Sequence, residues 1–311
     1  MESATAQAPA PTTGKRAPTD RARAERNLAW KLCAPAVLVM LLVTGYPIVY
    51  AFYLSLQRFD LRFPDEKEFV GLSNYADVLT SSTWWQDVFN TLFVTIISVS
   101  IELVLGMLIA LVMHRAIFGR GPVRAAILIP YGIVTVVAAF AWLFAFQPST
   151  GFVQNLPLVS DTADPLGDRW GSFLVIILTE VWKTTPFMAL LLLAGLALVP
   201  DELHEAAKVD GASTIQRFFR ITLPLMKPAI LVALLFRTLD AFRLFDTVFI
   251  QTLGANDTEV VSILGYQILI NRVNLGLGSA ISVLIFLCVI LIAVFFVKVL
   301  GTSTAQQRGE V

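Results

Sequence analysis

The sequence predicts an all-α membrane protein with six transmembrane helices. Of its 311 residues, 56% are hydrophobic and only 15% are charged, whereas a soluble domain carries about a quarter charged residues. The hydrophobic residues gather in six apolar runs, each long enough to cross a hydrocarbon core, which takes roughly 20 helical residues. The runs are 33–56, 89–113, 123–146, 173–199, 229–250 and 280–300. Buried helices of a soluble protein would need a large polar shell, which this sequence does not contain.

The distribution of basic residues predicts how these helices are oriented. The formal net charge is zero, which points to neither a nucleic acid nor an acidic partner. If the N-terminus is cytoplasmic, most of the 23 Lys and Arg residues fall on the cytoplasmic side, so the positive-inside rule places both termini in the cytoplasm. We expect a disordered cytoplasmic tail at 1–29, a transmembrane domain at 30–300, whose first helix stays as an uncleaved anchor, and a second cytoplasmic tail at 301–311.

The first run ends in aromatic residues and leads into an outside loop. Tyr46, Tyr50 and Tyr53 place their rings towards the outer interface, either as an ordinary aromatic belt or as part of a ligand site. The outside loop 57–88 is mixed in charge and contains FVGLSNY. It would suit a surface that an extracytoplasmic partner contacts.

The second run contains a carboxylate near its middle. Placing an acidic side chain there costs about 2.5–3.5 kcal/mol unless it is paired, protonated or hydrated, so Glu102 is expected to face inward. It would serve either a structural hydrogen bond between helices or transport. Gly106, one turn later, offers a point of close helix approach. The third run is followed by the outside loop 147–171, which is rich in Pro, Gly and Asp and is expected to be irregular.

The fourth run has a polar and aromatic outer half. It carries Glu180, Trp182, Lys183 and Pro186, and a proline inside a helix kinks it or frees a carbonyl. This combination fits either the wall of a cavity or a plain packing kink.

The fifth run holds four ionisable residues spaced three apart, namely Arg237, Asp240, Arg243 and Asp246. On one continuous helix, opposite charges at this spacing pair along a stripe. Such charges indicate either a polar pathway or a static ladder of ion pairs. Phenylalanines lie between them, and aromatic faces beside hydrogen-bonding groups suit a sugar ring. The candidate substrate pathway comprises Trp182, Lys183, Arg237, Asp240, Phe242, Arg243 and Asp246. The sixth run lacks interior charges and is expected to face lipid or a partner.

Between the fourth and fifth runs lies a polar cytoplasmic segment, residues 200–228, which we call the elbow. Asp201 and Glu202 sit where negative charge favours the start of a helix, and Gly211 is expected to end that helix. Ser213 and Gln216 form a capping-box pattern for a second helix, which Leu223–Pro224 is expected to stop. The apolar stripe of the second helix would consist of Ile215, Phe218, Phe219 and Leu223.

The elbow resembles the cytoplasmic signature loop of permease subunits in binding-protein-dependent ABC importers. The pattern EAA, two residues, DGA, five residues, Phe, four residues, LP is matched in register by Glu205, Ala206, Ala207, Asp210, Gly211, Ala212, Phe218, Leu223 and Pro224. The resemblance implies a type I ABC importer permease fold in a bacterial plasma membrane. It also implies that the elbow is the coupling element, seated in a groove on an ATPase subunit.

Further segments look like the carbohydrate-importing branch of that family. These are YPIVYAFYLSLQRFDL, FVGLSNY and FRTLDAFRLFDTVFI, and the pattern looks most like a mycobacterial trehalose-uptake permease. The chain departs from the branch at TLGAND, where a Gly-Gly-Pro pattern is common. The resemblance implies alternating-access uptake of a sugar, such as the disaccharide trehalose, with a second permease, two ATP-binding cassette subunits and an extracytoplasmic, lipoprotein-type sugar-binding protein.

The chain itself is expected to be neither an ATPase nor any other enzyme. It contains no GxxxxGK[ST] loop, and its only Gly-Lys pair is Gly14–Lys15, so ATP and Mg²⁺ would bind at the partner ATPase subunits. We expect no cofactor, metal or nucleic acid on this chain. Three alternatives stay open: an importer for glycerol phosphate or its diesters, a gated channel, and an intramembrane enzyme. The enzyme is disfavoured because His114 and His204, the only histidines, lie at the cytoplasmic edge of the runs.

Overall fold

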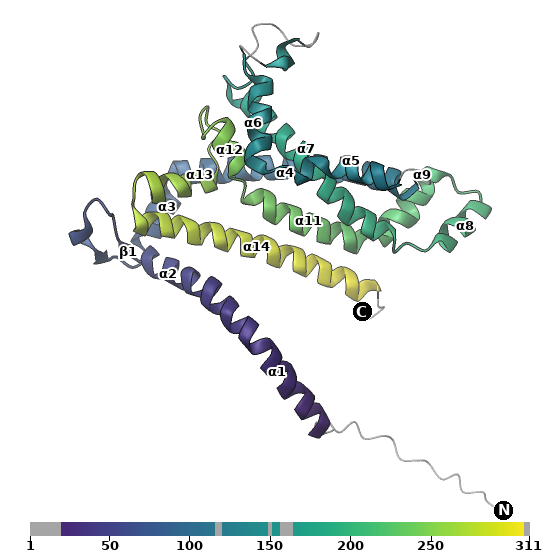
Figure 1. Ribbon diagram of the computed structural model, residues 1–311, viewed down its shortest axis with the longest axis horizontal. Helices are drawn as coiled ribbons and strands as arrows, with labels where there is room; N and C mark the ends of the chain where they lie inside the picture. The colour runs from purple at the N-terminus through teal and green to yellow at the C-terminus, as the bar shows by residue number, and fades with distance from the viewer. Residues whose placement is uncertain (1–19, 116–119, 149–150, 156–163, 308–311) are drawn as a thin grey trace, which may run out of the picture. The chain divides into compact units, whose positions relative to one another are not determined.

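The computed structural model describes residues 20–115, 120–148, 151–155 and 164–307, and most of them are helical (Figure 1). The chain divides into two compact units, Met1–Tyr50 and Ala51–Val311. Within the described residues, strands are limited to one antiparallel pair, β1 (Gln57–Arg58) with β2 (Glu68–Phe69). The predicted all-α class is therefore confirmed.

The first unit is a helix that begins before the first apolar run. α1 spans Asp20–Met40, the π-helical turn η1 spans Leu41–Gly45, and α2 (Tyr46–Ser55) starts in this unit. The turn lies just ahead of Pro47, whose nitrogen cannot donate to the helical ladder.

The disordered tail predicted for residues 1–29 is wrong from Asp20 onward, because α1 begins there. The segment DRARAERN consists mainly of Ala, Arg and Glu, which are strong helix formers and extend the helix beyond the apolar run. Residues 1–19 lie outside the described residues.

The candidate spans are either continuous or sharply bent. Four are continuous, namely Leu28–Ser55, Ser82–His114, Arg169–Leu196 and Leu275–Val299. Two more are bent pairs, Ala125–Gly132 with Thr135–Phe146 at 93° and Thr214–Leu225 with Lys227–Gln251 at 67°. If each pair counts as one span, the described residues contain the six spans that the sequence predicts.

The continuous helix predicted for 123–146 is wrong. α5 (Arg120–Gly132) and α6 (Thr135–Phe146) are separate, and Figure 1 shows them running in different directions. At the end of α5 the Ile133 amide donates a hydrogen bond to the Pro130 carbonyl. The backbone of the next residue, Val134, leaves helical geometry, with a ψ of 134°. Pro130, near the end of α5, lacks an amide hydrogen and weakens the helical ladder here.

The fifth run is also broken. α11 (Lys227–Phe242) ends before α12 (Asp246–Gln251) begins, although the break contains neither Pro nor Gly. Leu244 is buried in the break and packs in one cluster with Phe173 and Val248. The burial of the Leu244 side chain therefore outweighs the tendency of the helix to continue. Local sequence does not predict this break.

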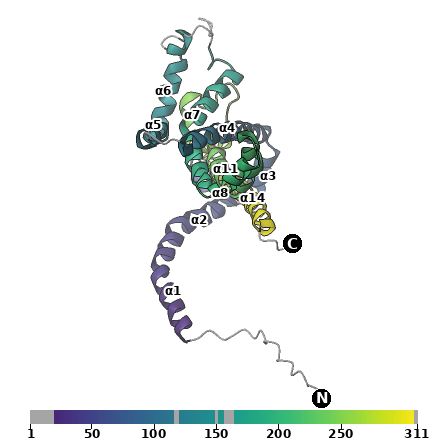
Figure 2. The same cartoon turned by 90° about the vertical axis from the view of Figure 1, so that its right-hand side faces the viewer.

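Two long helices form the centre of the second unit. α4 (Ser82–Arg115) packs along α7 (Arg169–Leu196), and α11 contacts both of them and α14 (Leu275–Gln307). Figure 2 shows α4, α11 and α14 gathered together, with α5 and α6 to one side. A Cβ added to Gly106 would lie 2.8 Å from Met188 Cγ, so the predicted close approach is confirmed.

α7 passes through Pro186 without a break, and Pro186 is buried. The predicted kink at this residue therefore does not interrupt the span. α14 is longer than the predicted 280–300 helix and occupies most of the expected C-terminal tail.

The predicted outside loop 57–88 is a small folded element. Its β1–β2 pair and a 3₁₀ turn, η2 (Pro64–Glu66), precede α3 (Ser73–Thr80). Within FVGLSNY, Asn74 Nδ2 donates to the carbonyls of Ser55 and Gln57 at 2.8 and 2.9 Å. The motif therefore fixes α3 to the chain that leaves α2.

The predicted outside loop 147–171 is only partly described. Its described part contains the 3₁₀ turn η3 (Phe152–Asn155) and ends at Asp168, which caps α7 by accepting from the Trp170 amide at 3.0 Å. The cap fixes where the buried helix begins.

Residues 251–278, between the fifth and sixth apolar runs, contain both a strained turn and helical segments. Leu253, Asn256 and Asp257 have positive φ values of 52°, 56° and 56°, in the TLGAND segment that departs from the family pattern. The short helices α13 (Val261–Tyr266) and η5 (Gln267–Asn271) then lead to α14.

Candidate functional site

The elbow folds as two helical arms around a glycine turn. The first arm is α8 (Asp201–Val209), and the second is the continuous run of α9 (Thr214–Arg217), η4 (Phe218–Thr222) and α10 (Leu223–Leu225). Gly211 has a φ of +79°, a conformation that glycine adopts without penalty. The predicted glycine turn is confirmed.

A capping box starts the second arm, as the sequence predicts. Ser213 Oγ accepts from the Gln216 amide at 3.3 Å, and Gln216 Oε1 accepts from the Ser213 amide at 2.8 Å. The prediction that the second arm stops at Leu223–Pro224 is slightly wrong. The arm continues to Leu225, and the chain then bends by 67° at Met226. Pro224 lies in this continuous run just after the π-helical turn η4, and its nitrogen cannot donate to the helical ladder.

The signature residues of the elbow lie mainly at its surface. Glu205, Ala206, Asp210, Gly211 and Pro224 are exposed, while Ala207, Ala212, Phe218 and Leu223 are half-buried. We call residues 205–212 the elbow tip. It includes Val209, whose side chain is 88% exposed.

The predicted apolar stripe divides into two halves. Phe218 and Leu223 pack against the core cluster that contains Met107, Leu196 and Met226, whereas Ile215 and Phe219 are exposed. The elbow is thus anchored to the helix bundle by one half of its stripe, and the other half stays open.

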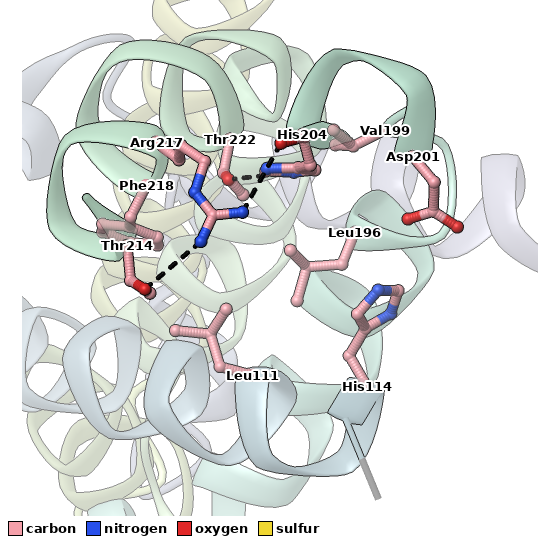
Figure 3. Close-up of a pocket in the computed structure, with 10 residues that line it drawn as sticks. All are labelled: Leu111, His114, Leu196, Val199, Asp201, His204, Thr214, Arg217, Phe218 and Thr222. Atoms are coloured by element: carbon pink, nitrogen blue, oxygen red, sulfur yellow. Dashed lines mark hydrogen bonds between the residues drawn. The ribbon is translucent and has the colours of Figure 1, made fainter. Parts of the chain in front are cut away.

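A cavity of about 310 Å³ lies between the elbow and the ends of α4 and α7 (Figure 3). We call it the elbow pocket. Arg217 spans its wall, donating to the His204 carbonyl at 3.5 Å and to Thr214 Oγ1 at 3.3 Å. His204 Nε2 also lies 3.5 Å from Thr222 Oγ1. These contacts join the two arms, and no sequence pattern singled out Arg217 or Thr222.

A buried ion-pair network, the Arg237 network, links the three central helices. Arg237 of α11 is 1% exposed, and its Nε lies 2.5 Å from Oε2 of Glu102 on α4. Arg237 Nη2 also lies 3.1 Å from Oε2 of Glu180 on α7. Glu102 is fully buried, so the prediction that it faces inward is confirmed.

Two hydroxyls and a third acid complete the network. Thr184 donates to Glu102 Oε1 at 2.8 Å, and Thr247 donates to Glu180 Oε1 at 2.5 Å. Arg237 Nη1 lies 2.7 Å from Oδ2 of Asp240, whose side chain is 67% exposed. The predicted pairing of Arg237 with Asp240 is confirmed, but the stripe ends there because α11 ends at Phe242.

A polar cavity of about 390 Å³ adjoins the exposed end of this network. Its lining includes two cations, three carboxylates and three hydroxyls, contributed by Tyr131, Thr135, Glu180, Lys183, Thr184, Asp240, Arg243 and Asp246, beside Leu244 and Phe245. Lys183 Nζ lies 5.7 Å from the Tyr131 ring centroid, within reach of a cation–π contact. The cavity can therefore offer both donors and acceptors to a hydroxylated ligand.

The predicted pathway residues separate into four groups. Lys183, Asp240, Arg243 and Asp246 line the polar cavity. Arg237 lies behind it in the network, and Phe242 is buried in another cluster with Val78 and Trp84. Trp182 lines a different cavity.

The cavity that Trp182 lines, which we call the aromatic cavity, has a volume of about 460 Å³ and is mostly apolar. Trp142 contributes to it from α6 and meets Trp182 edge-on, with ring centroids 5.9 Å apart. The sequence analysis missed Tyr131, Thr135 and Trp142, because they reach the cavities through the unpredicted bend between α5 and α6.

Charged groups outside the spans respond to their surroundings in opposite ways. Hydrogen bonding from Arg62 lowers the pKa of Asp60 to about 2. Burial raises the pKa of Glu259, and Arg272 opposes this in part. Within the described residues, no group of three His, Cys, Asp or Glu side chains is arranged to hold a metal ion.

Spanning helices that enclose ionisable side chains and carry an exposed polar elbow are typical of the membrane component of a transport system. Residues 79–306 match the family described as binding-protein-dependent transport system inner membrane component, and the chain belongs to this family. The expectation of an importer permease fold is therefore confirmed.

The chain has full-length relatives with named substrates. It is 54% identical over 310 residues to the trehalose transport system permease protein SugA of Mycobacterium tuberculosis strain H37Rv, covering 100% of this chain and 98% of that protein. It is 39% identical over 279 residues to the trehalose/maltose transport system permease protein MalF of Thermococcus litoralis, covering 88% and 94%.

A solved structure shares the fold at low sequence identity. It belongs to a bacterial ABC transporter involved in the import of the acidic polysaccharide alginate, with a TM-score of 0.77 and 22% identity. The match covers 91% of this chain and 99% of that chain. At this identity the match supports the fold and carries no inference about the substrate.

Proposed function

We propose that the chain is the permease subunit of an ATP-driven importer that takes up a neutral disaccharide, such as trehalose, by alternating access. The observation that carries this proposal is the polar cavity at the exposed end of the Arg237 network, where α11, which follows directly on the elbow, ends. The full-length similarity to the trehalose permease SugA supports the choice of sugar.

The lining of the cavity suits an uncharged, hydroxylated solute. Lys183 and Arg243 supply donors, and Asp240, Asp246 and Glu180 supply acceptors, so charges of both signs line the cavity. Sugar hydroxyls donate and accept at the same time, which matches such a mixed lining. An anionic solute such as a glycerol phosphate would face the carboxylates of Asp240, Asp246 and Glu180, which disfavours it.

Arg237 fits a fixed structural role, whereas the residues that face the cavity fit contact with the solute. The guanidinium is held by two buried carboxylates on two other helices. Moving it would leave those carboxylates buried without a cation, which costs several kcal/mol of stability, roughly 3–5. Asp240 and Arg243 are exposed to the cavity and can therefore form hydrogen bonds to a solute at little cost in stability. The two hypotheses for the charged segment thus apply to different residues.

The elbow would couple this site to ATP hydrolysis. We propose that the exposed elbow tip seats in a groove of an ATPase subunit, where ATP and Mg²⁺ bind. Closure of two such subunits would move the elbow, and the bend at Met226 passes that motion into α11. α11 is joined to α4 and α7 through Arg237, so the three helices would tilt as one rigid group.

The complete transporter would contain further components. We propose a second, similar permease, two ATP-binding cassette subunits and an extracytoplasmic sugar-binding protein that delivers its ligand to the outer loops 57–88, 147–171 and 251–278. In this arrangement both termini of the chain are cytoplasmic, in accord with the positive-inside rule.

Uptake by the reconstituted complex tests the proposal. The complex with its own binding protein is placed in vesicles with internal ATP and offered labelled trehalose, maltose, sucrose and glycerol phosphate. ATP-dependent accumulation of trehalose above the other solutes is expected. Accumulation of glycerol phosphate alone would overturn the assigned substrate class, and flux without ATP would identify a channel.

A further inference from the structure

The elbow pocket has a composition that sugar transport does not require. It contains both histidines of the chain, His114 and His204, together with Arg217 and Asp201 (Figure 3). Apolar residues of α4, α7 and η4 form the rest of its wall, among them Leu111, Leu196 and Phe218. A pocket that is charged on one side and apolar on the other suits an amphiphile.

The pocket lies where the spanning helices end. The candidate span formed by α4 ends at His114 and the one formed by α7 ends at Leu196, and both residues line the pocket. The end of an apolar span marks the boundary between the hydrocarbon core and the lipid headgroups. The charged side of the pocket is therefore at headgroup depth.

The charged side offers complementary groups for a phosphate and an amine. Arg217 is a fork of hydrogen-bond donors that matches phosphate geometry, and its Nε is buried without a hydrogen-bond partner among the described residues. The two imidazoles and the hydroxyl of Thr214 can add donors. Asp201 lines the same pocket and is an acceptor for an ammonium group. A cation and an anion together favour a zwitterion over a simple anion.

The apolar side continues into a neighbouring groove of about 290 Å³. Leu111, Thr214 and Phe218 line both spaces, and the groove adds Val112, Ile215 and Phe219. Ile215 and Phe219 are 71% and 60% exposed, so an acyl chain lying here would cover apolar surface that the described residues leave open.

From this arrangement we propose that the elbow pocket binds one phospholipid of the phosphatidylethanolamine type. The phosphate lies against Arg217 and the imidazoles, the amine faces Asp201, and one acyl chain follows the groove along Ile215 and Phe219. The lipid connects α8 and the second arm of the elbow to the ends of α4 and α7. It thereby stiffens the elbow and makes coupling depend on the lipid.

Lipid retention by the purified, assembled transporter tests this site. The complex is exchanged into an equal mixture of dioleoyl phosphatidylethanolamine, phosphatidylcholine and phosphatidylglycerol, then analysed by native mass spectrometry. We expect about tenfold preferential retention of phosphatidylethanolamine, the effect of one charged hydrogen bond. Equal retention of all three lipids, or preference for phosphatidylglycerol, overturns the proposal.

Matched variants test whether Asp201 binds the lipid amine and Arg217 binds the phosphate. Asp201→Asn should abolish the preference for the amine over choline while phospholipid is still retained, and Arg217→Gln should lower the retention of all three lipids. Glu202→Gln and Arg220→Gln, exposed neighbours that do not line the pocket, should leave retention unchanged. If Glu202→Gln has the same effect as Asp201→Asn, the amine is not bound at this pocket.

Two further experiments distinguish a bound phospholipid from other possible ligands of the elbow pocket. Glycerophosphoethanolamine and inorganic phosphate are added as soluble competitors, and displacement of the lipid by phosphate alone would overturn the zwitterionic assignment. Leu111→Trp narrows both spaces and should reduce retention even if Arg217→Gln fails to assemble. Retention that is unchanged in Leu111→Trp would place the lipid elsewhere.

Discussion

The elbow tip exposes most of its signature side chains, whereas the Arg237 network hides nearly all of its charges. Glu205 and Asp210 meet water, but Glu102 is fully buried and Arg237 is 1% exposed. A surface element loses function when its shape changes, and the remaining structure tolerates the loss. A buried network loses stability when one partner is removed, because the other charges remain without compensation.

The largest effect is expected from Arg237→Met. The variant leaves Glu102 and Glu180 buried without their cation, at a cost of about 3–5 kcal/mol. The complex should fail to accumulate or should melt at a much lower temperature. Detergent-solubilised yield and a fluorescence-monitored melting curve measure this.

The double variant Arg237→Met with Glu102→Met is the matched control, because it also removes the Glu102 carboxylate that the single variant leaves uncompensated, while Glu180 still lacks its cation. It should recover part of the lost stability. If the single variant is as stable as the wild type, the network is not a structural element and the contrast with the elbow tip fails.

The next largest effect is expected from Gly211→Val at the elbow tip. A β-branched residue at a φ of +79° is strained by about 1–2 kcal/mol, so the turn should change shape. Uptake and co-purification of the ATPase should fall to background, while permease yield stays near that of the wild type. Gly211→Asn is the control, because Asn tolerates this conformation. Normal uptake by Gly211→Val would refute a coupling role.

A smaller effect is expected from Arg243→Gln, in the polar cavity. Arg243 is exposed and forms no ion pair among the described residues, so its loss should leave assembly intact. Loss of one charged hydrogen bond to the sugar should raise the KM for uptake about tenfold. Failure to assemble would instead show that Arg243 belongs with the static network.

The two regions also differ in how far the sequence predicts them. The elbow depends on local interactions, so Gly211 and the Ser213–Gln216 box could be assigned from spacing alone. The Arg237–Asp240 pair, three residues apart on one helix, was predicted for the same reason. In contrast, Glu180 contacts Arg237 and Thr247 contacts Glu180 only through tertiary packing, which spacing does not encode.

Helix breaks explain the remaining errors. The bend after Gly132 has a local cause that sequence could have signalled, since Pro130 and Gly132 precede it. The break after Phe242 has no such signal, because the burial of Leu244 produces it. This break moves Arg243 and Asp246 off the predicted stripe and into the lining of the polar cavity.

The smallest effect is expected from Ser213→Ala, which tests how much local encoding matters at the elbow. The variant removes the acceptor for the Gln216 amide and should destabilise the second arm by about 1 kcal/mol. Because Phe218 and Leu223 still anchor this arm to the core, the elbow should fray at its turn and stay docked. Amide hydrogen exchange should therefore rise at residues 213–217 and stay unchanged in α11, with uptake reduced by less than in Gly211→Val. Ser213→Asp, which preserves the cap, should restore slow exchange. If exchange also rises throughout α11, the capping box supports more of the bundle than the elbow, and the mechanical separation between the two regions is incorrect.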